Sequence, residues 1–287
     1  MELKHTALRD ARLSAILRED MKMSAGLVNR LKWVDKILVN GTAQHTDYAV
    51  RIGDVITVPL DEEEPDYPPQ DGPLSILYED EHILAVDKPA GMLIHPSRSR
   101  FDGTLANFVL GYYRRTGQKS AFHPLTRLDR DTYGIVLLSK NSHIHALLQA
   151  SAVQKTYHAL VFGHWEPDTG TIDAPIGRKP LPSLLREVHP EGKPSVTEYE
   201  VLERFDGYTK LALRPVTGRT HQLRVHCAHM GHPILGDPQY GTPESAFGLP
   251  HQILCAKTLT FRHPITDEPM ELESAMDAKL NGFVYSS

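Results

Sequence analysis

The chain has 287 residues, of which 40% are hydrophobic and 23% charged, and its formal net charge is −5. These values are ordinary for a globular protein, and no apolar stretch approaches the length of a membrane span. Two cysteines, Cys227 and Cys255, are too few for a disulfide framework and suit a reducing compartment. Because the N-terminus also lacks an apolar signal core, we expect a cytoplasmic protein.

Residues 1–60 are predicted to form two helices followed by short strands. Apolar residues recur at helical spacing in RDARLSAILRED (9–20) and in SAGLVNRLKWV (24–34), where Ser24 is the predicted N-cap. Asn40-Gly41 predicts a hairpin between strand-like runs. The alternation in YAVRIGDVITVPL (48–60) predicts a second strand pair with its turn at Gly53-Asp54.

This arrangement, with Arg30, Lys32 and Lys36 around the second helix, resembles the S4 RNA-binding domain. The resemblance implies that these three cations contact RNA phosphates. The alternative is a generic helix–hairpin module with a solvated basic face, since basic residues are common on exposed helices. The sequence of this unit alone leaves both interpretations open.

The segment DEEEPDYPPQDGP (61–73) carries six acidic residues, no basic residue and four prolines. It cannot bury enough apolar surface to fold alone. We therefore predict a linker at 61–73, between a domain at 1–60 and a larger domain at 74–287. The segment holds more negative charge than the whole chain's net value, so the bulk charge says little about any binding face.

The large domain is predicted to be rich in strands. The predicted strands lie at 74–89 (two strands with a turn at 79–81), 134–140, 157–165, 196–205 and 208–216, and the predicted helices at 104–117, 142–153 and 219–231. Strands outnumber helices and do not alternate regularly with them. We therefore predict the α+β class, with a mixed, largely antiparallel sheet.

The segment HPLTRLDRDTYGIVLLSK (123–140) places an acid, Asp129, between Arg127 and Arg130, directly before a buried strand. Nearby positive charge lowers the pKa of a carboxyl group, so we expect Asp129 to be ionised and able to act as a nucleophile. The alternative is a structural ion pair at the start of a strand. Tyr157, at the start of another strand, is by itself typical of packing.

The predicted helix at 219–231 carries several groups that could do chemistry. His221, His226 and His229 invite a metal site, but His221 and His226 are five residues apart and no carboxylate lies nearby in sequence. The i,i+4 spacing typical of metal-binding helices is absent. DKPAGMLIHPS also lacks the ending of a phosphate loop. We therefore expect no metal, cofactor or nucleotide.

Four segments in order resemble the RluA-type pseudouridine synthases over about residues 75–265: DKPAGMLIHPS, TRLDRDTYGIVLLSK, KTYHALVFG and RPVTGRTHQLRVHCAHMGHPILGDPQYG. Each segment is modest alone, but all four in this order are highly specific. An S4-like domain ahead of them is the usual arrangement in that family. Two residues depart from the family pattern, because Thr126 stands where histidine is usual and Tyr133 where serine is usual.

The resemblance implies a role for each matching residue. Asp129 matches the catalytic nucleophile, and Arg224 matches the arginine that pairs with it. Arg127 matches the residue that fills the stack when the target uridine is flipped out. Tyr157 matches the tyrosine that packs on the target base and takes its C5 proton. We expect Arg219 and His221 to contact the RNA as well.

The sequence therefore predicts a monomeric RNA pseudouridine synthase that acts on structured RNA, ribosomal more than transfer, without a membrane or metal partner. One rival is a non-catalytic RNA-binding ribosome assembly factor, which would not need Asp129, Tyr157 and Arg224 together. Another is a glycoside hydrolase, which needs a second carboxylate. Asp131 is the only acid near enough in sequence, and it is expected to point elsewhere.

Overall fold

Residues 2–60 fold around a hydrophobic core of their own. The computed structural model describes residues 2–32, 36–60, 67–97, 100–183 and 185–277. In the first unit a four-stranded sheet has the order β1-β6-β3-β4, and the helices bury Leu13, Leu17 and Leu27 against it. The elements are β1 (Glu2–Thr6), β2 (Ala11–Arg12), α1 (Leu13–Ala15), the π-helical η1 (Ile16–Asp20), α2 (Ala25–Lys32), β3 (Leu38–Val39), β4 (Thr42–Ala43), β5 (Ala49–Val50) and β6 (Val55–Pro59).

Both helices and the first hairpin of this unit lie where the sequence predicts them. The first helix begins at Leu13 and continues from α1 through η1. The second is α2, where the Leu27 amide donates to Ser24 Oγ at 3.1 Å; the last residues of its predicted span, 33–34, lie outside the described residues. The strands β3 and β4 pair around Asn40-Gly41, both at positive φ.

The predicted pairing across Gly53-Asp54 is wrong. The strand β5 pairs with β2, whereas β6 pairs with β1 and β3. The reason is that β1, which the sequence patterns did not predict, offers β6 five antiparallel residue pairs, from Glu2↔Pro59 to Thr6↔Val55. Asp54 still closes a turn, because its carboxylate accepts the Arg51 amide at 2.8 Å.

The C-terminal part of the predicted linker lies along a helix of the large domain, α3 (Leu105–Arg115). The Gln70 amide donates to the Asn107 carbonyl oxygen at 2.9 Å, and the Asn107 side chain donates to the Pro68 carbonyl at 2.9 Å. A Cβ on Gly111 would meet the Gln70 carbonyl oxygen at 2.1 Å, so the close approach requires this glycine. Residues 61–66 lie outside the described residues, and the division into domains stays a prediction.

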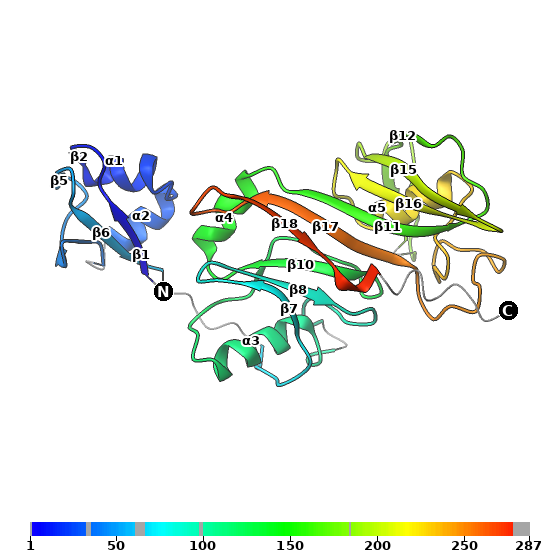
Figure 1. Ribbon diagram of the computed structural model, residues 1–287, viewed down its shortest axis with the longest axis horizontal. Helices are drawn as coiled ribbons and strands as arrows, with labels where there is room; N and C mark the ends of the chain where they lie inside the picture. Colours follow the sequence, from blue (N-terminus) through cyan, green and yellow to red (C-terminus); the bar gives the residue numbers. More distant parts are fainter. Residues whose placement is uncertain (1, 33–35, 61–66, 98–99, 184, 278–287) are drawn as a thin grey trace.

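A ten-stranded sheet forms the large domain, and its path runs β12-β15-β16-β11-β17-β10-β8-β7, with β18 on β17 and β9 on β10 (Figure 1). Its strands are β7 (Ser75–Glu79), β8 (Ile83–Lys88), β9 (His123–Pro124), β10 (Tyr133–Ser139), β11 (Gln154–Phe162), β12 (Thr169–Asp173), β15 (Val196–Phe205), β16 (Tyr208–Pro215), β17 (Leu254–Arg262) and β18 (Pro269–Glu273). The remaining elements are α4 (Ser142–Ala150), the hairpin β13 (Ile176–Arg178) with β14 (Arg186–Val188), α5 (Gln222–His229) and η2 (Ala275–Asp277). None of the helices in the described part of the chain is long and apolar enough to cross a membrane.

Helices cover both faces of the sheet where β8 and β10 lie. Leu84 and Val86 pack with Leu105 and Val109 of α3, whereas Ile83 and Ala85 pack with α4 on the opposite face. Strands buried on both faces are continuously apolar, and this is the pattern that the sequence shows at 83–86 and 135–138. The α+β class with a largely antiparallel sheet is confirmed, since only the β10–β17 pairing is parallel among the described strands.

Gly134 joins the two halves of the sheet. The parallel contact between β10 and β17 consists of Tyr133↔Cys255 and Gly134↔Ala256. Gly134 has a φ of +106°, and a Cβ there would lie 2.3 Å from the Ala256 carbonyl oxygen. Only glycine fits such a position without moving the backbone of β17. It therefore sets where the loop that precedes β10 lies on the sheet.

Candidate active site

A cavity of about 510 Å³ opens between the loop that precedes β10, the strand β11 and the N-terminal end of α5. This volume is within the usual range for small-molecule and nucleotide sites. Six residues that the sequence singled out line it: Arg127, Asp129, Tyr157, Arg219, His221 and Arg224. The fold thus places at one cavity several residues that lie up to nearly a hundred positions apart in the sequence.

The loop that carries Asp129 is fixed by hydrogen bonds on both sides. The Thr132 amide donates to the Asp129 carbonyl oxygen at 3.2 Å. On the N-terminal side, Thr126 is buried, and its hydroxyl accepts the Leu137 amide of β10 at 3.2 Å. The carboxylate itself keeps a side-chain exposure of 30% and faces the cavity. Rigid backbone with an accessible carboxylate is the geometry that a nucleophile or base requires.

Lys88 supports this loop from beneath. Its side chain is fully buried, and its ammonium group donates to the carbonyl oxygens of Arg130, Met92 and Pro89 at 2.9, 2.9 and 3.0 Å. Burial lowers the pKa of Lys88 to about 7, against the opposing effect of the carboxylates of Asp131 and Asp129. The sequence offered one signal for this role, because the lysine closes an apolar strand in the DKPAG segment.

Arg224 is the cation that contacts Asp129. Its Nη1 donates to Asp129 Oδ2 at 3.1 Å, while its Nε and Nη2 donate to both carboxylate oxygens of Asp237 at 2.7 Å each. The Arg224 side chain is 4% exposed and that of Asp237 is fully buried. Bidentate pairs of this kind fix the plane of the guanidinium group. Asp237 therefore aims Arg224 at Asp129.

Asp237 was missed in the sequence, although it lies in a segment quoted for the family resemblance. It accepts the amides of Gln239 and Tyr240 at 2.9 and 3.1 Å, so its position is fixed by a tight turn as well as by Arg224. The motif GDPQYG could have drawn attention to it. This motif places an acid between a glycine and a proline shortly after the helix that carries Arg224.

The interpretation that flanking arginines hold the Asp129 carboxylate ionised is wrong for Arg130. The Arg130 guanidinium donates from Nε and Nη2 to the two carboxylate oxygens of Asp131, at 3.0 and 2.8 Å. These bonds lower the pKa of Asp131 although its burial acts to raise it. Arg127 is exposed and lines the cavity, where the sequence placed it. Among the described residues, Arg224 is the cation in contact with Asp129, and His221 Nε2 lies 3.8 Å from its Oδ2.

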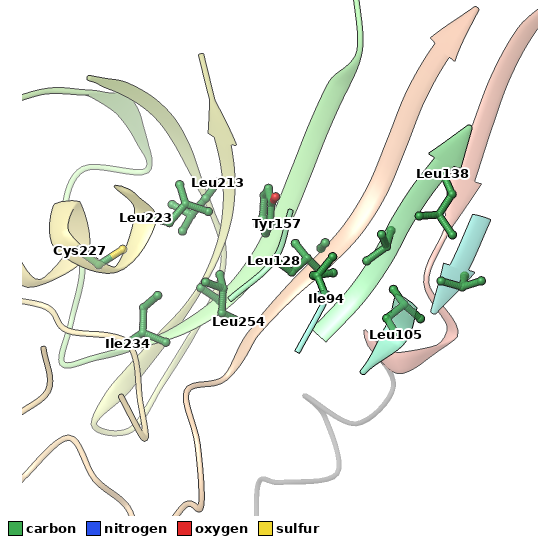
Figure 2. Packing of buried hydrophobic residues seen from close by; sticks show 14 of the residues in the cluster. Ile94, Leu105, Leu128, Leu138, Tyr157, Leu213, Leu223, Cys227, Ile234 and Leu254 are labelled. Carbon is green, nitrogen blue, oxygen red and sulfur yellow. The ribbon is translucent and has the colours of Figure 1, made fainter. Parts of the chain in front are cut away.

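Tyr157 lies on β11 within the main hydrophobic core, and Figure 2 shows it between the side chains of Leu213 and Leu128. Only 9% of the residue is exposed. Burial raises the pKa of the Tyr157 phenol, and the charge of Asp129 raises it further. The group therefore carries its proton at neutral pH, and it is one of the residues that line the cavity.

The other predicted contact residues fall into two places. Arg219 and His221 line the cavity, and Arg219 Nε donates to the Pro194 carbonyl at 3.1 Å. Arg30, Lys32 and Lys36 belong to the first unit, where all three are exposed at or after the end of α2. None of these three lines the cavity as it is described.

The helix that carries Arg224 begins later than predicted. α5 starts at Gln222, and His221 is its N-cap in the left-handed conformation. His226 is fully buried, with Nδ1 at 2.9 Å from Thr197 Oγ1 and Nε2 at 3.0 Å from the Ala174 carbonyl oxygen. These contacts assign His226 to the packing of α5 on the sheet.

The two departures from the family pattern lie beside the cavity. Thr126 is 1% exposed and bonded to β10, as described above, and Tyr133 is 4% exposed in a separate apolar cluster with Leu160 and Ile253. The ring of Tyr133 meets that of His251 edge-on, with their centres 6.1 Å apart. Neither residue is among those that line the cavity.

Comparison with known proteins identifies related sequences. Residues 82–229 match the family model described as RNA pseudouridylate synthase. The chain is 37% identical over 252 residues to "Uncharacterized RNA pseudouridine synthase YjbO" of Bacillus subtilis (strain 168), which covers 86% of this chain and 88% of that protein. It is 37% identical over 264 residues to "Ribosomal large subunit pseudouridine synthase D" of Escherichia coli (strain K12), covering 85% and 81%.

A solved structure has a similar fold. The human protein "RNA Pseudouridylate Synthase Domain Containing 1" superposes with a TM-score of 0.57 and 26% identity, covering 76% of this chain and 98% of that chain. The match to the family model spans Asp129, Tyr157 and Arg224.

Proposed function

The chain belongs to the RNA pseudouridylate synthase family, an isomerase family, and we propose that Asp129, Arg224 and Tyr157 are the residues with which it converts uridine to pseudouridine. The observation that carries this assignment is the 3.1 Å contact of Arg224 with Asp129 inside a cavity of nucleotide size. The arginine binds and orients a carboxylate that is also accessible from the cavity.

The reaction exchanges one bond of the nucleoside for another. The bond between C1′ and N1 breaks, the uracil turns within the cavity, and C1′ is rejoined to C5. N1 gains a proton and C5 loses one, so the reaction is balanced without an oxidant or reductant. Asp129 starts the reaction by attack on the nucleoside or by removal of a proton from it, and both routes require its ionised form.

In this proposal Tyr157, which lines the cavity, packs on the target base. The resemblance to the family also implies that it takes the C5 proton. Because its pKa is raised, the phenol is protonated at neutral pH. It therefore accepts the C5 proton only if its own proton leaves in the same step.

The two rival functions are disfavoured. An assembly factor without catalytic activity would not need an arginine held by a buried carboxylate and aimed at a second one. A glycoside hydrolase needs two carboxylates across one bond, and the carboxylate of Asp131 is engaged by Arg130. A sugar-release assay on a panel of glycosides separates the last rival directly.

We further propose ribosomal RNA as the substrate, a cytoplasmic location and a monomeric enzyme. Similar proteins named as ribosomal large subunit pseudouridine synthases support the first two. The S4-like unit, with Arg30, Lys32 and Lys36 exposed, supports binding to a large structured RNA.

The test of this function is a map of pseudouridines in total RNA from cells with and without the gene. We expect loss at one or a few uridines of large-subunit ribosomal RNA, and restoration by the purified enzyme added to the unmodified RNA. Loss confined to transfer RNA would overturn the ribosomal substrate but not the activity. An unchanged map, with no conversion by the purified enzyme, would refute the proposed function.

Arg127→Ala is expected to slow the reaction much more on a structured RNA than on a short strand whose target uridine is already unstacked. Arg127 is exposed at the cavity, where it can fill the gap left by a flipped base. Flipping costs a few kcal/mol only when the base is stacked. We expect about tenfold or more extra loss on the structured RNA, measured as single-turnover product formation.

The control for this prediction is Arg114→Ala, which removes an equal charge from the exposed end of α3, away from the residues that line the cavity. It should leave both substrates unaffected. Equal losses on the two RNAs in Arg127→Ala would show that Arg127 serves the protein structure instead of base flipping.

Deletion of residues 1–60 is expected to weaken RNA binding and to reduce its salt dependence. The unit has its own core, from Leu3 to Leu60, so the large domain should keep its fold. If the cations Arg30, Lys32 and Lys36 contact phosphates, the slope of log K against log salt should fall by roughly two. Replacement of the same three residues by Gln in the full chain should give the same change. An unchanged slope would contradict the S4-like role.

A further inference from the structure

A chain of hydrogen bonds connects the hairpin β13–β14 with the active-site cavity through Tyr240 and His221. The backbone amide of Arg186, the first residue of β14, donates to Tyr240 Oη at 2.9 Å. Tyr240 Oη lies 2.8 Å from Nδ1 of His221, and Nε2 of His221 faces Asp129 Oδ2 at 3.8 Å. The two side chains thus join a surface hairpin to the proposed nucleophile.

The partners of Tyr240 Oη bear on where His221 carries its proton. An amide N–H can only donate, so Tyr240 Oη accepts from Arg186, and its own proton has His221 Nδ1, 2.8 Å away, as a partner. In a neutral imidazole one ring nitrogen accepts a hydrogen bond and the other ring nitrogen carries the hydrogen. If the Tyr240 hydroxyl donates to Nδ1, the imidazole proton lies on Nε2, the atom that faces Asp129.

The separation of His221 Nε2 from Asp129 leaves this donor for the substrate. At 3.8 Å the contact is longer than a hydrogen bond. Both groups line the cavity, so an oxygen atom of the bound nucleotide can lie within reach of the Nε2–H and the carboxylate together. The backbone agrees with a functional role, since His221 is held at a φ of 59°, a conformation that costs energy for residues other than glycine.

We propose that Tyr240 is a positioning residue that fixes His221 as a neutral Nε2–H donor beside Asp129, where His221 donates to an oxygen of the target nucleotide during the reaction. The proposal rests on the proposed function, because it assigns roles for the same reaction. The sequence led us to expect only that His221 contacts the RNA. The present proposal assigns Nε2 as the donating atom and Tyr240 as the residue that holds the tautomer.

The charged groups around His221 agree with a neutral imidazole. Burial lowers the pKa of His221, and the positive charges of Arg224 and Arg186 lower it too, against the opposing effect of Asp129 and Asp237. Donation by the Tyr240 hydroxyl to Nδ1 stabilises the neutral form as well. Protonation at low pH would place hydrogen on Nδ1, break the bond from Tyr240 and pair the imidazolium with Asp129. Activity should therefore fall below the pKa of His221.

Tyr240→Phe tests the proposal, because it removes the hydroxyl but keeps the ring over which Arg224 lies, 5.0 Å from its centre. We expect the single-turnover rate at neutral pH to fall about five- to tenfold, as for the loss of one hydrogen bond, with little change in RNA affinity. Without the donor to Nδ1 the pKa of His221 rises, so the acid limb of the pH–rate profile should move to higher pH.

The second variant is His221→Asn. Asparagine tolerates positive φ and places an acceptor near the position of Nδ1, but it has no atom at the position of Nε2. We expect a loss of rate at least as large as that of Tyr240→Phe. Because Tyr240 acts through His221, the double variant Tyr240→Phe/His221→Asn should be no slower than His221→Asn alone.

Tyr112→Phe is the matched control, since it removes a hydroxyl that donates to Glu79, outside the cavity. It should leave the rate and the pH profile unchanged. A Tyr240→Phe enzyme with the wild-type rate and profile, or with a further loss in the His221→Asn background, would overturn the proposal. Activity of the wild-type chain in the same assay keeps this outcome distinct from a failure of the proposed function.

Discussion

Asp129→Asn is expected to abolish pseudouridine formation, with a loss of at least roughly 10⁴-fold, while the fold and the RNA affinity stay close to those of the wild type. Asparagine has the same shape and its oxygen still accepts from Arg224 Nη1, but it is neither an ionised nucleophile nor a base. Because the side chain is 30% exposed, the loss of its charge costs little stability. The measurement combines product formation, RNA binding and thermal unfolding on the same protein.

Asp131→Asn is the matched control for this variant. It removes a carboxylate only two residues away, but one that is bound to Arg130 and not to Arg224. We expect it to keep most of the activity. Product formation by Asp129→Asn above a trace would refute the assignment of Asp129, and a complete loss in Asp131→Asn with the fold intact would show that both carboxylates are required.

Arg224→Met is expected to abolish activity and also to destabilise the protein. It leaves the fully buried carboxylate of Asp237 without its bidentate partner. Removal of one member of a buried ion pair costs about 3–5 kcal/mol. In a domain of this size that lowers Tm by roughly 6–20 °C. Thermal unfolding and single-turnover product formation measure the two effects separately.

The double variant Arg224→Met/Asp237→Asn separates stability from catalysis. Asparagine removes the buried charge, and its oxygen can still accept the amides of Gln239 and Tyr240. We expect most of the lost stability to return, while activity stays absent because Asp129 lacks its cation. A double variant that regained activity would show that Arg224 acts only through the fold. An Arg224→Met protein as stable as the wild type would contradict the energetic role of the Asp237 pair.

The local elements with strong periodicity could be predicted from the sequence. The pattern of apolar residues predicted five of these elements. They are β8 and β10, with continuous apolar runs, β15, with alternating apolar residues, and α3 and α4, with apolar residues at helical spacing. β17 was missed, although it lies at the centre of the sheet. Its Lys257 and its threonines interrupt the apolar pattern. The lysine is accommodated because its ammonium donates to the Ser274 carbonyl oxygen at 2.7 Å and pairs with Glu273 Oε1 at 2.8 Å.

Strand pairing could not be predicted in the first unit. A turn at Gly53-Asp54 is a local property, and the sequence indicated it. Whether β5 and β6 then pair depends on competition from β1, about fifty residues earlier in the chain. Pairing is decided by the number of hydrogen bonds and apolar contacts that each arrangement gives, which a local pattern does not contain.

The sequence by itself determined the class of the large domain and, through the resemblance of four ordered segments, the family. It also led to Asp129, Tyr157 and Arg224 as the proposed site residues. It did not determine the electrostatics of the site. The sequence suggested that the neighbouring arginines interact with Asp129. In the structure Arg130 binds Asp131 instead, and Arg224, 95 positions away in the chain, contacts Asp129. Charge interactions depend on distance and burial in space. Only the tertiary structure, with Asp237 behind Arg224 and Tyr240 behind His221, decided which groups act on the carboxylate.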